Sequence, residues 1–470
     1  MRWVADFVYL IAGLIYLPVA LYHALVVGKN RRGWGQRFGF GPTFDPLRPR
    51  VWIHAVSLGE INATPRLVDG LRERRPDCEI VVSTTTDTGF ARAVQLYGTD
   101  RVFHFPLDFS PVVSRVLRRV APSLIVLVEL EVWYNLVGLA SNRCIPVAVV
   151  NGRLTERSVR RLSRLGPPVR AMFERLTWIG AQDETFAARF RAVGARQDRV
   201  EITASLKWDS AAVTDHVDGA EELAGAVGLD RTRPLWVCGS TGPGEEAMIL
   251  DAYRHLSRGA ATVARTVPDH HAAKGNDSPS PHLAIIPRKP ERFDEVARLI
   301  EREGFRCVRR SERRSATTAA EAIEPVVVLG DTMGELRKFY ALADVIFIGR
   351  SLVPLGGSDP MEAAALGKPI VVGPYMQNFQ LPTDALRAAG ALYVVDSAGA
   401  LADKVRGVLE DRASGKRMGI RGREVVLKNQ GATQRTVERL AALLPTAAPR
   451  VLRTGSTSAS LPQSSCAVQG

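Results

Sequence analysis

The chain of 470 residues contains few cysteines and few aromatic side chains. Its five cysteines, Cys78, Cys144, Cys238, Cys307 and Cys466, are scattered and include no CxxC pair. This argues against a zinc site or a scaffold built on disulfides, and it suits a reducing compartment. Aromatic residues make up only 7% of the chain, with no stacking ladder and no RNA-binding signature. We therefore expect no nucleic acid as a partner.

The chain also has fewer acidic than basic residues, with 49 Asp and Glu against 62 Lys and Arg, which gives a net charge of +13. Such an excess needs an anionic partner or surface. With nucleic acid disfavoured, a phospholipid surface or a phosphorylated lipid remains, and we favour the membrane. The hydrophobic share of 46% permits a large core, and the length leaves room for two α/β domains of roughly 200 residues each.

Residues 7–27 contain no Lys, Arg, Asp or Glu. As a helix this run would extend roughly 30 Å, the thickness of a bilayer core, so residues 1–30 are predicted to form a membrane anchor. Four basic residues follow between positions 29 and 37, and only Arg2 precedes the run. The positive-inside rule then places the body of the protein in the cytoplasm.

Two alternatives to a spanning helix stay open. Pro18 and His23 weaken the span, so the helix could instead lie in the membrane interface. A cleaved signal peptide is disfavoured, because the run is long and no small-x-small cleavage site closes it.

From residue 50 onwards, short apolar runs alternate with helical patterns, which predicts doubly wound α/β domains. We assign residues 31–220 to a first domain and 221–445 to a second. Residues 259–282 form a polar insert, expected to be a surface loop in which His270 and His271 are solvated and bind no metal. Residues 446–470 are of low complexity and expected to be disordered. Strands are predicted at residues 51–55, 79–83, 124–128, 147–150, 178–180, 200–203, 235–238, 283–286, 326–329 and 345–348.

The segment 326–374 holds two buried strands that each end at a glycine and lead into a helix. The first turn is Gly330-Asp331-Thr332-Met333-Gly334-Glu335. The second contains Gly349, Gly356 and Gly357 before Pro360-Met361-Glu362 opens a helix. Glycines allow close approach of the backbone, and a helix start suits a phosphate. Glu362 is placed to accept hydrogen bonds from sugar hydroxyls, so the pattern fits a nucleotide donor.

Polar residues after other strands complete the candidate site, because ligands of open α/β sheets bind at the carboxyl ends of the strands. Glu60 follows the first strand; it is either a general base for an acceptor hydroxyl or a cap of the next helix. Glu129 and Glu131 follow a buried strand and are functional or are surface acids in ion pairs. Lys207 is directed to the site or decorates the surface. Arg288 follows strand 283–286 and is placed for a phosphate.

Taken together, the motifs resemble the Kdo transferases, membrane-bound enzymes that add 3-deoxy-D-manno-oct-2-ulosonic acid (Kdo) to lipid A precursors in lipopolysaccharide biosynthesis. The resemblance extends from the anchor to about residue 440. It rests on VSLGE (56–60), ELEVW (129–133), NGRLTERS (151–158), SLKWD (205–209), PRKPERF (287–293), GDTMGEL (330–336) and PMEAAALGKP (360–369).

This resemblance implies a GT-B fold, in which two Rossmann-like domains face a cleft. The phosphorylated acceptor, lipid IVA, would bind the first domain and CMP-Kdo the second. Glu60 would deprotonate the acceptor hydroxyl, with inversion at the anomeric carbon, while Glu129 and Lys207 would support the transition state. No cofactor and no metal are implied. The positions that match the CMP site are Pro287, Arg288, Met333, Gly334, Glu335, Asp359, Pro360, Met361 and Glu362.

The sequence departs from the family pattern at three places, which involve five residues. Ser358 and Asp359 stand where His-Asn is usual, and Asp359 is expected to cap the donor helix as Asn would. Arg350 occupies a position that is usually glycine. Gly242-Pro243 replaces a typical His-Glu. These departures concern the details of the donor site more than the reaction class.

Two other functions are compatible with the sequence. One is a GT-B hexosamine transferase or epimerase that uses a UDP-sugar. The other is a membrane-tethered anion-binding protein without catalysis.

Overall fold

The computed structural model describes residues 6, 7, 9–11, 15, 33–130, 132–263, 280–312 and 326–445, with side chains of 258–263 excepted. The chain divides into two compact units. Unit 1 comprises Met1–Ser210 and Gln430–Gly470, and unit 2 comprises Ala211–Asn429. Most of the uncharged run 7–27, Glu131, most of the insert 259–282 and the tail 446–470 lie outside the described residues.

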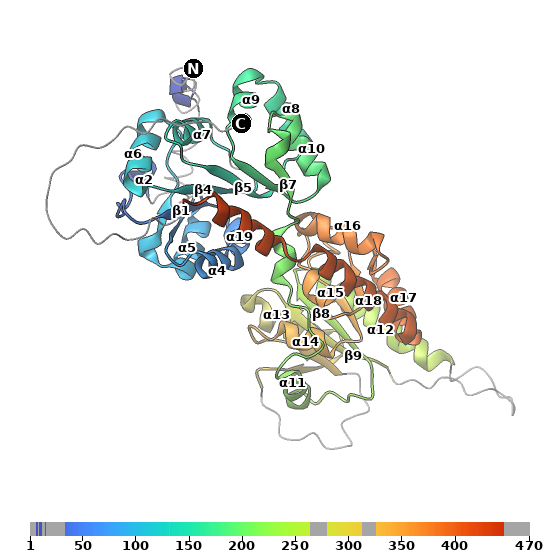
Figure 1. Cartoon of the computed structure of the whole chain (residues 1–470). Helices are drawn as coiled ribbons and strands as arrows, with labels where there is room; N and C mark the ends of the chain where they lie inside the picture. Colours follow the sequence, from blue (N-terminus) through green and yellow to red (C-terminus); the bar gives the residue numbers. More distant parts are fainter. Residues whose placement is uncertain are drawn as a thin grey trace, which may run out of the picture. The chain divides into compact units, whose positions relative to one another are not determined.

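Unit 1 is built on a sheet that, among the described residues, has seven parallel strands in the order β3-β2-β1-β4-β5-β6-β7 (Figure 1). The strands are β1 Arg50–His54, β2 Glu79–Thr84, β3 Val102–His104, β4 Leu124–Val128, β5 Val147–Gly152, β6 Trp178–Ala181 and β7 Val200–Ile202. The helices are α2 Trp34–Arg37, α3 Leu58–Asn62, α4 Pro65–Arg74, α5 Asp87–Tyr97, α6 Ser110–Val120, α7 Tyr134–Ser141, α8 Glu156–Ser163, α9 Pro167–Glu174, α10 Glu184–Ala192 and α19 Ala432–Leu443, with short 3-10 turns at Thr99–Arg101, Gln197–Arg199 and Leu206–Ser210.

Unit 2 has a second sheet, again of seven parallel strands in the described part of the chain, ordered β10-β11-β9-β8-β12-β13-β14. Its strands are β8 Leu235–Thr241, β9 His282–Pro287, β10 Arg306–Arg309, β11 Val326–Leu329, β12 Val345–Ile348, β13 Ile370–Val372 and β14 Leu392–Val394. The helices are α11 Ala220–Ala226, α12 Glu245–Val263, α13 Phe293–Arg302, α14 Leu336–Leu342, α15 Met361–Ala365, α16 Gln380–Ala388, α17 Ala398–Glu410 and α18 Arg412–Asn429, with 3-10 turns at Pro290–Arg292 and Gln377–Phe379.

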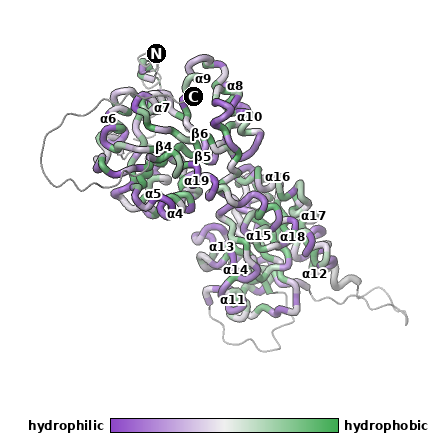
Figure 2. Tube along the Cα trace, in the orientation of Figure 1, coloured by the Kyte–Doolittle hydropathy of each residue, from purple (hydrophilic) through white to green (hydrophobic). Residues whose placement is uncertain are grey.

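The central strands are buried on both faces, as expected of parallel sheets covered by helices. Every residue of β1, β4 and β5 is buried, and so is every residue of β8, β9 and β12. Figure 2 shows the same distribution, with hydrophobic residues gathered along the strands inside each unit. This confirms the predicted α/β class.

Helix α19, the last one in the described part of the chain, belongs to unit 1, whereas the sequence places residues 430–445 in the second domain. It packs against α4, where Gly70 leaves room for Val437. Asp209 anchors its start, because one carboxylate oxygen accepts the Gly431 N–H at 2.7 Å and the other accepts the Thr433 N–H. The periodicity of the sequence shows the helix but not which sheet it covers.

The predicted membrane-spanning helix and the state of the cysteines can both be compared with the structure. In the described residues, no helix is long and apolar enough to cross a bilayer. Cys78, Cys238 and Cys307 carry free thiols, whereas Cys144 is in a disulfide.

Candidate functional site

Unit 1 brings Glu60 and Glu129 to the point where the strand order reverses. β1 and β4 are neighbours in the sheet, but the chain runs from β1 outward to β2 and β3 before it returns to β4. Ligands of open α/β sheets bind at this switch point, beyond the carboxyl ends of the strands. Glu60 follows β1 and Glu129 directly follows β4.

The carboxylate of Glu60 is half-buried at the start of α3, and each of its oxygens accepts one hydrogen bond. Its Oε2 accepts the Val56 N–H at 2.8 Å and its Oε1 accepts the Ser57 hydroxyl at 2.9 Å. In return, the Glu60 N–H donates to the Ser57 hydroxyl oxygen at 3.4 Å, which completes a capping box. The capping role left open by the sequence is therefore present, and it holds the carboxylate in one orientation.

Burial raises the pKa of Glu60 above its ordinary value. The bonds from Val56 and Ser57 lower this pKa, and the negative charge of Glu129 raises it. Because β1 and β4 are neighbours, Glu60 and Glu129 stand at the same edge of the sheet, where the charge of Glu129 acts on Glu60. A carboxyl group with a raised pKa is a stronger base near neutral pH than an ordinary glutamate.

Glu129 has a backbone conformation that is rare for its residue type. Its φ is +62°, in the left-handed region, and its N–H donates to the Val150 carbonyl of β5 at 2.9 Å. Strained backbone of this kind persists where the surrounding structure fixes it, and it is found disproportionately at functional sites.

Lys207 lies in a turn beyond the carboxyl edge of the same sheet, and Asn151 holds this turn in place. The sequence did not reveal this role of Asn151. Asn151 is the second-last residue of β5 and has φ +54°, and its Oδ1 accepts the Ser205 hydroxyl at 3.2 Å and the Leu206 N–H at 3.1 Å. These bonds fix the 3-10 turn that carries Lys207, which is half-buried. The sequence signal that could have indicated this role was an asparagine at the end of a strand. Apart from glycine, asparagine is among the residue types that most readily adopt a left-handed backbone conformation.

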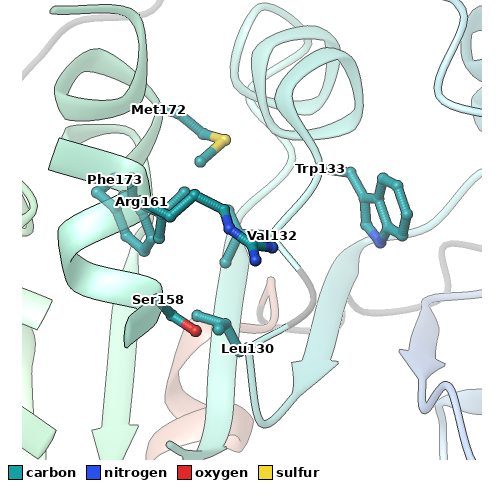
Figure 3. Close-up of a pocket in the computed structure, with 8 residues that line it drawn as sticks. Leu130, Val132, Trp133, Ser158, Arg161, Met172 and Phe173 are labelled. Carbon is teal, nitrogen blue, oxygen red and sulfur yellow. The ribbon is translucent and has the colours of Figure 1, made fainter. Parts of the chain in front are cut away.

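A cavity of about 230 Å³ lies beside this edge in unit 1. It is lined by Leu130, Val132 and Trp133 after β4, by Ser158, Arg161 and Leu162 of α8, and by Met172 and Phe173 of α9. Figure 3 shows the Arg161 side chain extending across the cavity towards Val132. The lining is therefore mostly apolar with one cationic side chain.

Unit 2 has its own switch point between β8 and β12. Two turns meet there. The turn after β8 contains Gly242, and the loop after β12 runs from Gly349 to Asp359. Gly349 packs so closely on Thr241 that a Cβ would lie 2.5 Å from its Cα, and the Ser358 hydroxyl donates to the Ser240 carbonyl at 3.4 Å.

The predicted donor residues gather around this point. The Arg288 N–H, directly after Pro287 of β9, donates to the Thr241 carbonyl at 3.1 Å. Burial raises the pKa of Tyr340 well above its ordinary value, and the charges of Glu362 and Asp359 raise it further, whereas Arg288 lowers it. The charges of three predicted residues therefore act on the same buried phenol.

The start of α15 differs in detail from the sequence prediction, because its N-cap residue is Pro360 and not Asp359. The Asp359 carboxylate, one residue earlier, accepts the Met361 N–H at 2.8 Å, so it still satisfies one of the N–H groups at the helix start. The Glu362 carboxylate is half-buried, and no hydrogen bond or ion pair to it is found in the described part of the chain.

Glu335 is placed differently from Glu362. Arg310 and Lys338 both pair with its carboxylate, at 3.1 Å and 3.3 Å, and the Thr332 hydroxyl donates to it. Beside it, Gly334 has φ +85° and Met333 is 69% exposed. Across the described ranges, no group of three or more His, Cys, Asp or Glu side chains is arranged to hold a metal ion.

Comparison with known proteins gives three findings. Residues 32–210 match the family model for 3-deoxy-D-manno-octulosonic-acid transferase (kdotransferase). The 3-deoxy-D-manno-octulosonic acid transferase of Haemophilus influenzae is 32% identical, over 88% of this chain and 91% of its own length. The C-terminal CMP-Kdo binding domain of WaaA from Acinetobacter baumannii is 28% identical, covering 44% of this chain and 95% of that domain, with a TM-score of 0.37.

A more distant structure resembles the whole architecture. The UDP-GlcNAc 2-epimerase of Neisseria meningitidis superposes with a TM-score of 0.50 at 14% identity, over 84% of this chain and all of its own. At that identity the likeness concerns the fold alone, and it supports a GT-B-like fold class with two Rossmann-like sheets.

Proposed function

The chain belongs to the 3-deoxy-D-manno-octulosonic acid (Kdo) transferase family, and from this premise we propose that it transfers Kdo from CMP-Kdo to a phosphorylated lipid A precursor, lipid IVA. The observation that carries the proposal is the pairing of Glu60 and Glu129 at the switch point of unit 1. This point is where the fold class places its ligands.

In the proposed reaction, Glu60 accepts the proton of the acceptor hydroxyl. The acceptor oxygen then bonds to the anomeric carbon of Kdo with inversion. The bond from that carbon to the phosphate oxygen breaks, and its electron pair leaves with CMP. A positioned general base typically contributes a factor of about 10²–10⁴ in rate.

Lys207 and Glu129 would act on the charges that develop during this step. The Lys207 ammonium offsets negative charge near the reacting centre, and its turn is held by Asn151. Burial raises the pKa of Glu60, and the negative charge of Glu129 adds to this effect. The left-handed backbone conformation of Glu129 fixes the direction in which its side chain leaves the backbone.

For the donor, we propose that CMP binds the switch point of unit 2. Arg288 would meet the phosphate, and the Glu362 carboxylate would accept hydrogen bonds from the ribose hydroxyls. Glu335 is engaged by Arg310 and Lys338, so its turn would contribute the backbone of Met333 and Gly334. Pro287, Asp359, Pro360 and Met361 would shape the walls of this site.

For the acceptor, the cavity beside Glu129 would take part of an acyl chain. Its volume of about 230 Å³ lies below the roughly 300–1,000 Å³ of sites that enclose a whole drug-sized ligand. It therefore suits one segment of a chain rather than a complete glycolipid. Arg161 at its edge would attract an anionic group of the acceptor.

We also propose that unit 1 associates with the cytoplasmic side of the inner membrane through its N-terminal segment. Among the described residues, Phe7, Leu10 and Ile15 are all more than half exposed, and such apolar side chains would suit contact with lipid. Asp6 fixes this segment to unit 1, because its Oδ1 accepts the N–H of Ser110, at the start of α6, at 2.9 Å.

The test is to incubate the full-length protein with CMP-Kdo and lipid IVA and to weigh the products by mass spectrometry. We expect CMP release that depends on the acceptor and a lipid product heavier by Kdo. A parallel reaction with UDP-N-acetylglucosamine serves as the control. Turnover of the UDP-sugar without transfer of Kdo would contradict the proposal, and so would the absence of any product.

A further inference from the structure

Arg350 lies in a backbone conformation that arginine rarely adopts. Its φ is +61°, in the left-handed region that favours glycine. The conformation is held from within, since the N–H groups of Arg350, Ser351 and Leu352 all donate to the buried carboxylate of Glu245. The loop after β12 therefore begins at a fixed, strained point.

The side chain of Arg350 is held in place but not neutralised. Its Nη2 donates to the Leu355 carbonyl at 3.0 Å, and its Nε is buried without a partner. In the described part of the chain, no carboxylate forms an ion pair with it. A guanidinium has five N–H donors, so most of its binding capacity is unused.

The position of this cation is set by the neighbouring turn. A Cβ placed on Gly242 would lie 3.1 Å from the Arg350 Cγ and 2.5 Å from a methyl carbon of Leu355. The stem of Arg350 therefore lies over Gly242, at the end of β8. The Arg350 carbonyl also accepts the Gly357 N–H at 2.8 Å, which brings the loop back towards Asp359.

We propose that the Arg350 guanidinium binds an anionic oxygen of the sugar-nucleotide donor, either on the phosphate or on the Kdo carboxylate. This rests on the proposed function, because it assumes that the donor occupies the switch point of unit 2. A planar guanidinium matches the oxygens of both groups, and strained residues persist where function requires them. Arg350 would add a cation to that of Arg288.

The binding test compares Arg350→Gln with the wild type by isothermal titration calorimetry, using CMP and cytidine. Arg417→Gln, an exposed arginine of α18, is the matched control because it makes the same change in charge. We expect Arg350→Gln to weaken CMP binding about tenfold or more, with no effect on cytidine. Arg417→Gln should bind both ligands like the wild type.

The KM for CMP-Kdo, measured beside the affinity for CMP, shows whether Arg350 binds the phosphate or the Kdo carboxylate. A loss seen with CMP identifies the phosphate. An unchanged affinity for CMP with a raised KM for CMP-Kdo identifies the carboxylate. If neither quantity changes, the Arg350 proposal is overturned while the proposed function stands. If the wild type binds neither CMP nor CMP-Kdo, the proposed function fails and the Arg350 proposal fails with it.

A second variant, Arg350→Gly, tests whether the arginine is only structural. It removes the guanidinium and relieves the left-handed strain, so we expect the melting temperature to stay unchanged or to rise by roughly 2–4 °C. Donor binding should weaken as in Arg350→Gln. A lower melting temperature together with unchanged donor binding would show that Arg350 only supports the loop.

Discussion

A single side chain, Glu60, has two roles in this account. Its hydrogen bonds to Val56 and Ser57 stabilise the start of α3, and its carboxylate is the proposed base. The two roles are compatible because the capping box fixes the direction of the carboxylate. A carboxylate oxygen offers more than one lone pair, so both oxygens can still accept a further hydrogen bond.

Substitution can separate these roles. Glutamine at position 60 keeps an oxygen for the Val56 N–H and preserves the cap, but it cannot accept a proton. We expect Glu60→Gln to lower kcat by at least about 100-fold, with CMP affinity and melting temperature close to those of the wild type. Glu60→Ala should lose the same activity and, in addition, on the order of 1–3 kcal/mol of stability. Near-normal turnover by Glu60→Gln would refute the assignment of the base.

The pH dependence of transfer reports on the same carboxyl group. As pH falls, Glu60 becomes protonated and cannot act as a base, so kcat/KM should decrease on the acid side. Burial raises the pKa of Glu60, so this decrease should begin at a higher pH than for an ordinary glutamate. Glu129→Gln removes a negative charge that raises this pKa, and the acid limb should therefore move to lower pH. An acid limb at the same pH in wild type and Glu129→Gln would contradict the proposed pair.

At the scale of elements, the central strands were predictable and the peripheral ones were not. The prediction at 124–128 matches β4, because five consecutive apolar residues admit little else. β3, β10, β13 and β14 were missed. Each has only three or four residues, too few for a period to show clearly, and their pairing with neighbouring strands depends on the assembled sheet.

The candidate site was predictable to the same extent. A residue after a buried strand must lie at the carboxyl edge, which sufficed for Glu60, Glu129 and Arg288. The role of Asn151 was not readable, because its partners Ser205 and Leu206 are 54 and 55 residues away in the chain. The strain at Arg350 likewise depends on Glu245, which is more than 100 residues away.

The cavity lined by α8 and α9 leads to a prediction about binding of the acceptor. Leu162→Trp would fill the cavity beside Glu129, and α8 tolerates the change because none of its residues is buried. Each CH₂ group excluded from burial costs about 0.8 kcal/mol, so we expect the KM for lipid IVA to rise about tenfold. A deacylated acceptor should be unaffected. Leu165→Trp, at a site 61% exposed, is the matched control. Equal effects of Leu162→Trp on both acceptors would rule out an acyl-chain site.

At the scale of the whole molecule, the two units differ in how the chain builds them. Unit 2 is one continuous segment, Ala211–Asn429, whereas unit 1 needs the helix α19 from the far end of the chain. Ala432, Val437, Leu440 and Leu444 of this segment belong to the buried core of unit 1. Burying one Val or Leu side chain contributes about 1.5–3 kcal/mol. The loss of this segment is therefore comparable with the whole stability of a typical domain.

Fragments test this difference. We expect residues 211–429 alone to fold cooperatively and to bind CMP. Residues 1–210, purified in detergent, should lack a cooperative thermal transition by circular dichroism. Joining residues 430–445 to residue 210 through a flexible linker should restore the transition, with a linked segment of scrambled sequence as the control. A stable fold of residues 1–210 alone would show that α19 is dispensable.

The return of α19 to unit 1 also sets an order of events during protein synthesis. The carboxylate of Asp209 must wait for the N–H groups of Gly431 and Thr433, which the ribosome makes more than 200 residues later. At about 5–20 residues per second, this delay is roughly 10–45 s. Throughout it, the apolar side of α4 that α19 will cover stays open in the nascent chain. Unit 1 is the first to be synthesised and the last to be completed. We therefore expect chaperones to bind its exposed apolar surface until translation ends.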